Sequence, residues 1–359
     1  RGRLDARRTL KSLVADLRMN NIYSKVFITN LPSFYKLNLY NAIAENERIF
    51  VVFTGDTAGE RNRDFFKGDM RFEYFAYKQS GLLYRIMTTL KLLLSLKWWE
   101  CVIGGWDSVP MWMFALLSAS KKNSVVVESS YFESQTKGLK GLIKKIFIRN
   151  IRKKAYVSGV GQRRLVEDLR FKGEIVETKG VGVFNYVEQP QYEPRTQVRN
   201  FLYVGRLTAV KNLPFLINAF KNRLDLTLNI VGFGEQEEYL KSIAGDNVNF
   251  LGAVDNKKLP QVYQENDVFV LPSKSEVWGL VVEEALNNGA PVLVSDRVGC
   301  GPEIVNESNG LVFKFDSEED LLSKIDRISQ IDYYNELRKN ISKLDFAEIE
   351  RRQIECYLK

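Results

Sequence analysis

Histidine is absent from the 359 residues of this chain. This absence excludes a Ser-His-Asp or Cys-His nucleophile, a histidine zinc site and a histidine proton shuttle. If the chain is an enzyme, carboxylates, lysine, tyrosine, cysteine or the substrate itself must therefore move the protons.

Cysteine is nearly absent as well. Cys101, Cys300 and Cys356 are far apart in the sequence and form no C-x-x-C pair. Such sparse cysteines are typical of a reducing compartment, and not of a cysteine zinc cluster or a disulfide scaffold. We therefore expect a cytoplasmic protein without a bound metal.

The sequence also lacks the run of roughly 20 apolar residues that a membrane-spanning helix needs. Its longest apolar run, around residues 92–94, lies between Lys91 and Lys97. The first 18 residues are basic but lack the apolar segment of a signal peptide. We expect Met19 to be the native start and residues 1–18 to be a remnant of cloning or of an upstream sequence.

The composition is otherwise ordinary, with 45% hydrophobic and 27% charged residues and a formal net charge of +8. The charge is unevenly distributed. Residues 1–200 contain 34 Lys and Arg against 19 Asp and Glu, a balance of +15. Residues 201–359 contain 18 against 25, a balance of −7. This asymmetry indicates two domains with different partners.

Short apolar segments alternate with helical segments along the chain. The expected strands are residues 25–30, 49–53, 101–104 and 124–127, followed by 200–204, 226–231, 248–251, 268–271 and 291–295. Strands that are apolar throughout and alternate with helices predict parallel sheets covered on both faces.

A polar stretch with two prolines, residues 185–194, interrupts this alternation and marks a domain boundary. We predict an α/β protein with two Rossmann-like domains. Its expected parts are the first domain at 19–188, a linker at 189–199, the second domain at 200–335 and a C-terminal helical segment at 336–359. Because ligands of open parallel sheets lie beyond the carboxyl ends of the strands, two such domains predict a cleft between them.

Two loops of the second domain have residues suited to a phosphate. Arg206 and Lys211 follow a predicted strand and precede a helix, which places two cations where a diphosphate would lie. A solvated basic loop is the alternative. Gly232 and Gly234 end the next strand, where they would allow close approach to a ligand or simply form a tight turn.

Residues 272–292 form the most informative segment of the sequence. A helix is expected to begin near Gly279, and its free N–H groups and positive dipole would accept a phosphate. Glu276 lies just outside this helix and Glu284 about one turn inside it, so both carboxylates could hold sugar or ribose hydroxyls. Glu283 should face elsewhere. A solvated acidic helix start is the alternative, but it does not explain the apolar pair Val277-Trp278.

These motifs resemble the C-terminal domain of the family 4 retaining glycosyltransferases. The resemblance rests on Gly205-Arg206 with Lys211 and on the pattern P-S-x-x-E-x-x-G-L-x-x-x-E-A, and it covers about residues 200–330. It implies the GT-B fold, in which two Rossmann-like domains face a cleft and the C-terminal helix crosses back to the first domain. The segment from Asn30 to Lys36 more weakly resembles the first turn of the acceptor domain.

The resemblance also implies a role for each matching residue. Arg206 and Lys211 would neutralise the diphosphate of a nucleotide-sugar donor, and the amides of Gly279 and Leu280 would cap its distal phosphate. The remaining donor residues would be Glu276 as the catalytic residue at the transferred sugar, Glu284 at the ribose, the turn glycines Gly232 and Gly234, and Phe250 and Leu251 near the base. On the acceptor side, the matching residues are Asn30, Pro32 and Ser33.

This chain departs from the family in one respect, because some members use a histidine of the first domain near the donor sugar. Asp107 and Glu128 both follow predicted strands and are possible substitutes, although a structural hydrogen-bonding role is equally open. No D-x-D motif occurs, so we expect no metal cofactor. Arg206, Lys211 and the helix end would instead stabilise the departing diphosphate.

We therefore expect a retaining, metal-independent hexosyltransferase of cell-surface polysaccharide biosynthesis, such as lipopolysaccharide or capsule. It would use a nucleoside-diphosphate sugar, with a UDP-sugar expected before other nucleotides, and a glycan or lipid-linked acceptor. Front-face attack is expected, with the leaving phosphate taking the acceptor's proton. The alternatives are a nucleotide-sugar-binding protein, an epimerase of the same architecture or a basic nucleic-acid-binding protein.

The basic first half contains a segment suited to an anionic membrane. Residues 137–154 include eight cations and no anion, with apolar residues interleaved at helical spacing. This pattern predicts a membrane-surface helix, or equally a core-packed helix with a basic outer face. Residues 82–99 have the same character. We expect a peripheral protein at the inner face of the cell membrane and no nucleic-acid partner, because no nucleic-acid-binding motif is present.

Overall fold

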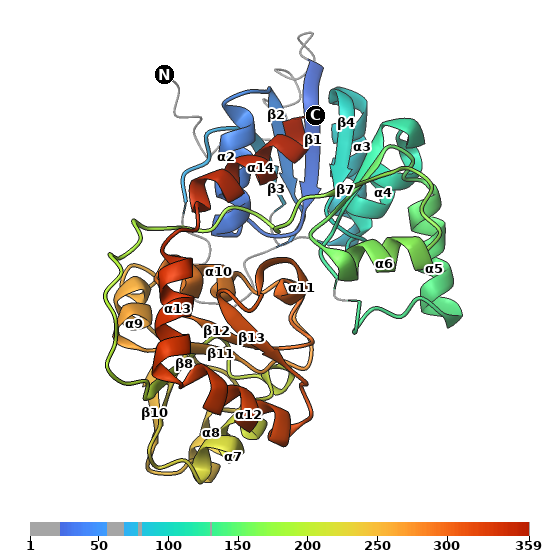
Figure 1. Ribbon diagram of the computed structural model, residues 1–359. Helices are drawn as coiled ribbons and strands as arrows, with labels where there is room; N and C mark the ends of the chain where they lie inside the picture. The colour runs from blue at the N-terminus through green and yellow to red at the C-terminus, as the bar shows by residue number, and fades with distance from the viewer. Residues whose placement is uncertain (1–21, 56–67, 78–80, 130, 359) are drawn as a thin grey trace.

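The computed structural model describes residues 22–55, 68–77, 81–129 and 131–358, which form two α/β domains (Figure 1). The expected remnant at residues 1–18 lies outside this described part. Both sheets are parallel throughout, with strand orders β3-β2-β1-β4-β5-β6-β7 and β10-β9-β8-β11-β12-β13. The predicted fold class, two Rossmann-like domains, is therefore confirmed.

The seven strands of the first sheet come from residues 22–177. They are β1 (Ile22–Thr29), β2 (Ile49–Phe53), β3 (Glu73–Ala76), β4 (Lys97–Ile103), β5 (Asn123–Val127), β6 (Lys154–Val157) and β7 (Glu174–Glu177). Of these, β1, β2, β4 and β5 were expected from the sequence. The other three are four residues long and include Glu73, Lys154 and Glu174, which interrupt the apolar pattern on which the prediction depended.

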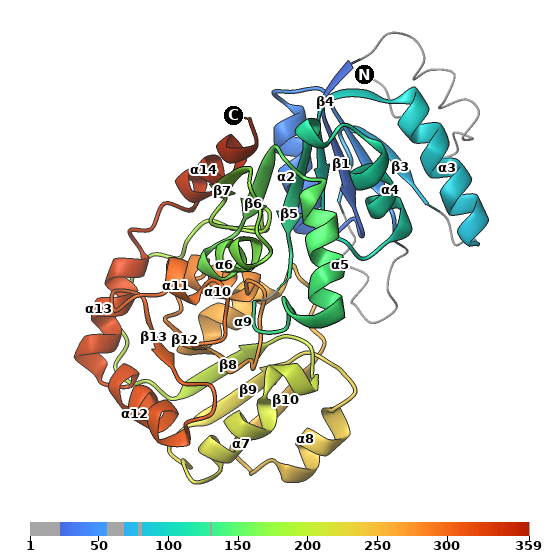
Figure 2. The same cartoon turned by 90° about the vertical axis from the view of Figure 1, so that its right-hand side faces the viewer.

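Helices cover both faces of the first sheet. They are α2 (Phe34–Ala44), α3 (Leu82–Ser95), α4 (Val109–Leu117), α5 (Gly138–Arg149) and α6 (Val160–Asp168), together with the 3-10 turn η2 (Ser120–Lys122). Because side chains alternate along a strand, Val26 and Ile28 of β1 join the core layer under α3 to α6, whereas Phe27 joins the layer under α2. Figure 2 shows α3, α4 and α5 along one side of this domain.

The second domain has one continuous core around its six-stranded sheet. Its strands are β8 (Asn200–Val204), β9 (Thr227–Val231), β10 (Val248–Gly252), β11 (Val268–Leu271), β12 (Val292–Ser295) and β13 (Gly310–Phe313). Its helical elements are η3 (Ala209–Lys211), α7 (Leu213–Lys221), α8 (Glu237–Ile243), α9 (Leu259–Glu265), α10 (Leu280–Asn287), α11 (Gly301–Ile304), α12 (Glu318–Ile328) and α13 (Ile331–Ile341). Only β13 was missing from the expected strands.

The last helix, α14 (Phe346–Leu358), returns to the first domain, as expected (Figure 1). Its Tyr357 is buried and stacks on Tyr156 of β6, with ring centroids 4.5 Å apart. The expected boundary between residues 335 and 336 was misplaced, because it falls inside α13. Leu337 and Ile341 continue the buried face of that helix in the second-domain core, so the chain leaves this domain only after residue 341.

None of the described helices combines the length and the apolar character that crossing a bilayer requires.

Candidate functional site

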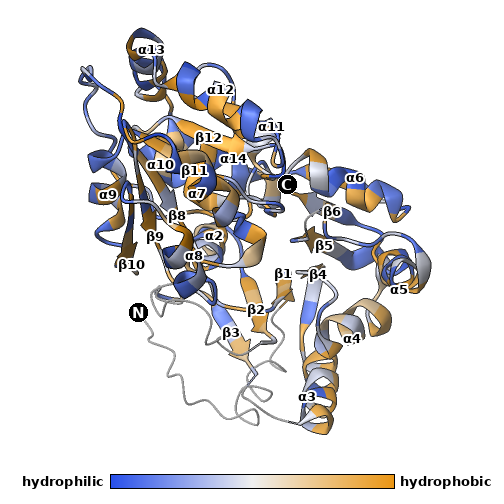
Figure 3. Cartoon of the chain, turned by 90° about the horizontal axis from the view of Figure 1, so that it is seen from below, coloured by the Kyte–Doolittle hydropathy of each residue, from blue (hydrophilic) through white to orange (hydrophobic). Residues whose placement is uncertain are grey.

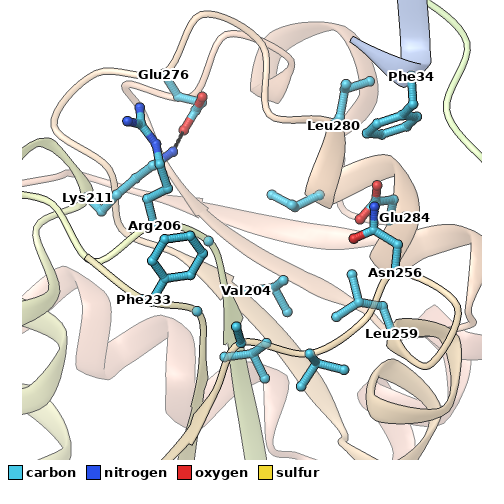
Figure 4. A pocket seen from close by; sticks show the side chains of 16 residues that line it. Phe34, Val204, Arg206, Lys211, Phe233, Asn256, Leu259, Glu276, Leu280 and Glu284 are labelled. Carbon is cyan, nitrogen blue, oxygen red and sulfur yellow. Dashed lines mark hydrogen bonds and ion pairs between the residues drawn. The ribbon is translucent and has the colours of Figure 1, made fainter. Parts of the chain in front are cut away.

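A cavity of about 310 Å³ opens at the carboxyl ends of β8 and β9, beside α10 (Figure 4). We call it the second-domain cavity. Val204 and Gly205 at the end of β8 line it, as do Val231 and Gly232 at the end of β9. This is the edge at which parallel sheets bind ligands, since the loops after each strand converge there.

The two predicted cations both lie in the loop after β8. Arg206 is exposed, and Lys211 is half-buried at the end of η3. Asn212, which follows Lys211, adopts a left-handed conformation and donates to the carbonyl of Phe315 at 3.1 Å. This local turn directs the Lys211 side chain into the cavity, toward Glu276 (Figure 4).

The two turn glycines have different roles. A Cβ on Gly232 would lie 1.8 Å from the carbonyl oxygen of Gly205, so the turns after β8 and β9 can approach each other only with glycine there. Gly232 also lines the cavity. Gly234 does not, and a Cβ there would lie 2.4 Å from the carbonyl oxygen of Leu207. For Gly234, therefore, the structure favours tight-turn geometry over ligand contact.

Glu276 lies in the loop between β11 and α10, and its carboxylate forms an ion pair with the ammonium of Lys211. The loop is fixed on its other side, because the Glu276 amide donates to the carbonyl of Arg297 at 3.1 Å and the Gly299 amide donates to the carbonyl of Glu276 at 3.0 Å. The side chains of Lys211 and Glu276 are 14% and 20% exposed. The two groups expected at the diphosphate and at the sugar are thus in direct contact.

Gly279 caps the N-terminus of α10 in a left-handed conformation, with a φ of 103°. A Cβ there would lie 3.2 Å from Val298 and 3.3 Å from Leu271, so glycine allows the close packing of this turn on the sheet. Trp278 is buried, and its indole N–H donates to Glu283 at 2.8 Å. Glu283 accordingly faces the interior, as expected, and burial raises its pKa to about 8.

Glu284 lines the second-domain cavity one turn into α10, as predicted. The hydroxyl of Tyr263 donates to it at 3.2 Å, and burial raises the pKa of Glu284 to about 7. Figure 4 shows Glu284 beside Asn256 and away from the Lys211–Glu276 pair. The cavity therefore has a cationic end and a separate polar end, with apolar side chains between them.

Phe250 and Leu251 were expected near the nucleotide base, but neither lines the cavity. Phe250 packs against the core of the second domain, and Leu251 is 48% exposed. Ala253 and Val254 line this part instead, because β10 ends at Gly252 and the residues after a strand end turn toward the cleft. The sequence analysis also missed Asn256 and Leu259, which the same strand-end rule would have suggested.

A second cavity, of about 390 Å³, lies between the two domains. We call it the interdomain cavity. It shares residues with the second-domain cavity, including Arg206, Lys211 and Glu276. Its lining from the first domain includes Asn30, Ser33, Lys36 and Glu128, and from the second domain also Gly279 and Leu280.

Only some of the residues predicted on the acceptor side line the interdomain cavity. Asn30, Ser33 and Glu128 line the interdomain cavity, whereas Pro32 does not. Asp107 is exposed and lines neither cavity. Lys36 also lines the interdomain cavity, although the sequence analysis gave it no role there. Its partner Glu128 is 92 residues away in the sequence, so the motif from Asn30 to Lys36 does not reveal this contact.

Among the described residues, no group of three or more His, Cys, Asp or Glu side chains could hold a metal ion.

Comparison with known proteins agrees with this geometry. Residues 187–344 match the family model described as glycosyl transferases group 1. The O-antigen biosynthesis glycosyltransferase WbnH of Escherichia coli is 35% identical over 182 residues, which are 50% of this chain and 51% of that protein. The chain therefore aligns with about half of the length of this relative.

Solved structures resemble the whole chain. The lipopolysaccharide outer core galactosyltransferase WaaB has a TM-score of 0.65 at 16% identity, covering 92% of this chain and 99% of the other. Anabaena HepE in complex with UDP and glucose has a TM-score of 0.67 at 13% identity, covering 93% and 99%. At such identities the likeness concerns the fold alone. The chain therefore has the two-domain GT-B fold, and its residues 187–344 match the group 1 glycosyl transferase model, which is consistent with the resemblance to the family 4 glycosyltransferases.

Proposed function

We propose that this chain is a retaining glycosyltransferase that moves a hexose from a UDP-sugar to a glycan or a lipid-linked saccharide in cell-surface polysaccharide biosynthesis. One observation carries the proposal. The second-domain and interdomain cavities meet at Arg206, Lys211 and Glu276, so a nucleotide in one cavity would present its sugar to an acceptor in the other.

The cationic end of the second-domain cavity suits a diphosphate. Arg206, Lys211 and the N-terminus of α10 supply positive charge or free N–H groups at one point. Such charges stabilise the negative charge that develops on the departing diphosphate, and they need no metal to do so. We expect chelation of divalent metals by EDTA to leave the rate unchanged.

The other end suits a nucleoside. Glu284 and Asn256 can accept hydrogen bonds from ribose hydroxyls, and the apolar side chains of Val231, Val254 and Leu259 can pack against a base. A similar structure supports a uridine nucleotide, since HepE was solved with UDP and glucose.

In the proposed reaction, the bond between the anomeric carbon and the diphosphate oxygen breaks, and the nucleoside diphosphate leaves with the electron pair. The acceptor oxygen bonds to the same face of the anomeric carbon. Its proton passes to the departing phosphate oxygen, which is consistent with the absence of histidine. Glu276 would contact the transferred sugar at this face, with its carboxylate held by Lys211.

A thermal-shift screen tests the proposal. UDP-glucose, UDP-galactose, UDP-N-acetylglucosamine, GDP-mannose and dTDP-glucose would be compared with the free nucleotides. A ligand at one hundred times its dissociation constant stabilises a protein by about 2.7 kcal/mol, and we expect the UDP-sugars to do so. Stabilisation by none of them would contradict the proposal. Release of UDP from the stabilising sugar nucleotide would then separate a transferase from a protein that only binds nucleotide-sugars.

We also propose that the first domain docks on an anionic membrane. Exposed apolar residues on α3, the start of β4 and the end of α4, which we call the α3–α4 surface, support this proposal. Figure 3 shows hydrophobic residues, in orange, along α3 and α4. Its exposed apolar residues are Leu82, Leu83, Tyr84, Met87, Leu90, Leu94, Trp99, Leu116 and Leu117. Four of them, Leu90, Leu94, Trp99 and Leu117, line a groove of about 660 Å³. A large exposed apolar patch marks an interaction site.

The charge around the α3–α4 surface favours an anionic bilayer as its partner. Residues 81–99 and 108–122 contain five cations and no acidic residue. Each cation near an anionic leaflet contributes about 1 kcal/mol to binding. Docking there would bring the first domain to a lipid-linked acceptor at the inner face of the cell membrane.

In the basic segment at residues 137–154, some apolar residues pack in the core and others are exposed. Phe147 and Ile148 of α5 pack in the core, whereas Leu139, Leu142 and Ile143 are at least 44% exposed. Figure 2 places α5 on the same side of the domain as α3 and α4. The exposed end of α5 would therefore extend the membrane-facing surface.

A further inference from the structure

A buried ion pair forms part of the first-domain wall of the interdomain cavity. Lys36 of α2 is 3% exposed, and its ammonium lies 2.8 Å from a carboxylate oxygen of Glu128. Glu128 follows β5, and its side chain is 24% exposed. Both residues line the cavity opposite Glu276.

The ammonium of Lys36 has no proton left for a ligand. Besides Glu128, it donates to the hydroxyl of Thr29 at 2.9 Å and to the side-chain oxygen of Asn30 at 3.1 Å, which uses all three N–H bonds. Burial lowers the pKa of Lys36, but the nearby Glu128 carboxylate outweighs this effect and raises the pKa above its ordinary value. Lys36 therefore acts on the cavity only by holding Glu128.

One carboxylate oxygen of this wall has no donor among the described residues. The Glu128 oxygen that Lys36 binds is Oε2, and no described residue donates to Oε1. Because the Glu128 side chain is 24% exposed and lines the cavity, this carboxylate can accept a hydrogen bond from a bound hydroxyl group.

A purely structural role explains this arrangement less well. Replacing a buried ion pair with apolar residues of similar volume is often neutral or stabilising, so the fold alone does not require Lys36 and Glu128. The pair also leaves its carboxylate at the wall of a cavity that Arg206, Lys211 and Glu276 line from the other domain. A charged group in this position is expected of a binding site.

We propose that Glu128, positioned by Lys36, accepts a hydrogen bond from a hydroxyl of the transferred hexose and selects neutral hexoses over hexuronic acids. The inference rests on the proposed function. The hexose of the donor is the ligand in question because the diphosphate to which it is attached belongs at Arg206 and Lys211, which line the same cavity. A sugar carboxylate at this wall would meet the Glu128 carboxylate and be repelled, whereas a hydroxyl would bind.

The selectivity is measurable as a ratio of dissociation constants. Calorimetric titration would compare UDP-glucose with UDP-glucuronic acid, and UDP-galactose with UDP-galacturonic acid, with UDP alone as the reference. We expect the wild type to prefer the neutral sugar by about tenfold or more in at least one pair. In Glu128→Gln this preference should shrink severalfold while the affinity for UDP stays unchanged. Glu45→Gln removes an exposed carboxylate of the same domain and should leave the preference as in the wild type.

A double variant keeps the inference testable if Glu128→Gln alone leaves Lys36 unpaired and unfolds the domain. Lys36→Met with Glu128→Gln removes both charges, so it should fold and still lack the preference for neutral hexoses. Lys36→Met alone should weaken the preference as well, which a purely structural role would not do. Equal preferences in the wild type and the folded double variant would overturn the inference. A wild type that binds none of these sugar nucleotides would instead contradict the proposed function.

Discussion

Lys211 and Glu276 form an ion pair at the place where the second-domain and interdomain cavities meet. Lys211 comes from the turn after β8, and Glu276 comes from the loop before α10, 65 residues later. The pair keeps the Glu276 carboxylate oriented while leaving the cation next to the proposed diphosphate site. Ligand binding would therefore change the charge around both residues at once.

Loss of the Glu276 carboxylate should abolish most of the activity. For Glu276→Ala we expect transfer to fall about 10²–10³-fold, because a contact near the reacting centre is worth that much in catalysis. Because the side chain is only 20% exposed and pairs with Lys211, the melting temperature should be measured first to establish that the variant is folded. Glu238→Gln on α8 is the matched control, because that side chain is 94% exposed. Unchanged transfer by Glu276→Ala would show that the site is assigned wrongly.

Lys211 should contribute mainly to donor binding. We expect Lys211→Met to raise the dissociation constant of UDP about tenfold or more, since a hydrogen bond to a charged group contributes about 1.5–3 kcal/mol. Titration of UDP at low and high salt measures the effect. Lys221→Met, an exposed cation at the end of α7, should bind UDP like the wild type. Equal weakening in both variants would point to the overall charge of the domain and not to this site.

The stability of the second domain should decrease as the pH rises from about 5 to about 8. Burial raises the folded-state pKa of Glu284 to about 7 and that of Glu283 to about 8, both from an ordinary value of 4.5. Between these limits the folded state binds more protons than the unfolded state. Stability is therefore greatest below the unfolded pKa and is lost as the pH rises through the folded pKa.

Glu284→Gln should make this decline shallower. Each such carboxyl contributes at most about 1.4 kcal/mol per pH unit, so removing one leaves only the share of Glu283. Thermal unfolding between pH 5 and pH 8.5 measures the slope, and Glu238→Gln should retain the slope of the wild type. A variant as steep as the wild type would mean that Glu284 is not the buried titrating group.

Membrane binding should depend on the α3–α4 surface. Leu94 is 88% exposed there, and Leu94→Asp should lower partitioning onto phosphatidylglycerol vesicles about tenfold or more, because a buried leucine contributes about 1.5–3 kcal/mol. Leu224→Asp is the matched control, since Leu224 is 78% exposed on the second domain. Replacing Lys144 and Lys145 of α5 with Glu tests the adjoining basic segment. Undiminished vesicle binding by Leu94→Asp would contradict this orientation.

The second domain was more predictable from sequence than the first. Its strands are mostly apolar, so periodicity located β8 to β12 and the residues at their carboxyl ends. Arg206, Lys211, Glu276 and Glu284 lie close together because those ends share one edge of the sheet. Phe250 and Leu251 lie just before the lining residues Ala253 and Val254, because the precise end of β10 decides which side chains reach the cavity.

The structure of the first domain was harder to predict, because it depends more on contacts between residues that are distant in the sequence. The short strands β3, β6 and β7 interrupt the apolar pattern with charged residues, and partner strands rather than local preference hold them in the sheet. Asp107 and Glu128 were equivalent candidates in the sequence, since both follow strands. Only the packing of Lys36 against Glu128, 92 residues away, distinguishes them.

The sequence by itself therefore determined the fold class, the absence of histidine chemistry and the positions of the cations and carboxylates that line the second-domain cavity, because these follow from local periodicity and from motifs on single strand ends. Only the tertiary structure decided which first-domain carboxylate faces the cleft, that Lys211 pairs with Glu276 and that α3 and α4 leave an apolar surface exposed. Each of these depends on the three-dimensional meeting of segments far apart in the chain, which local patterns do not specify.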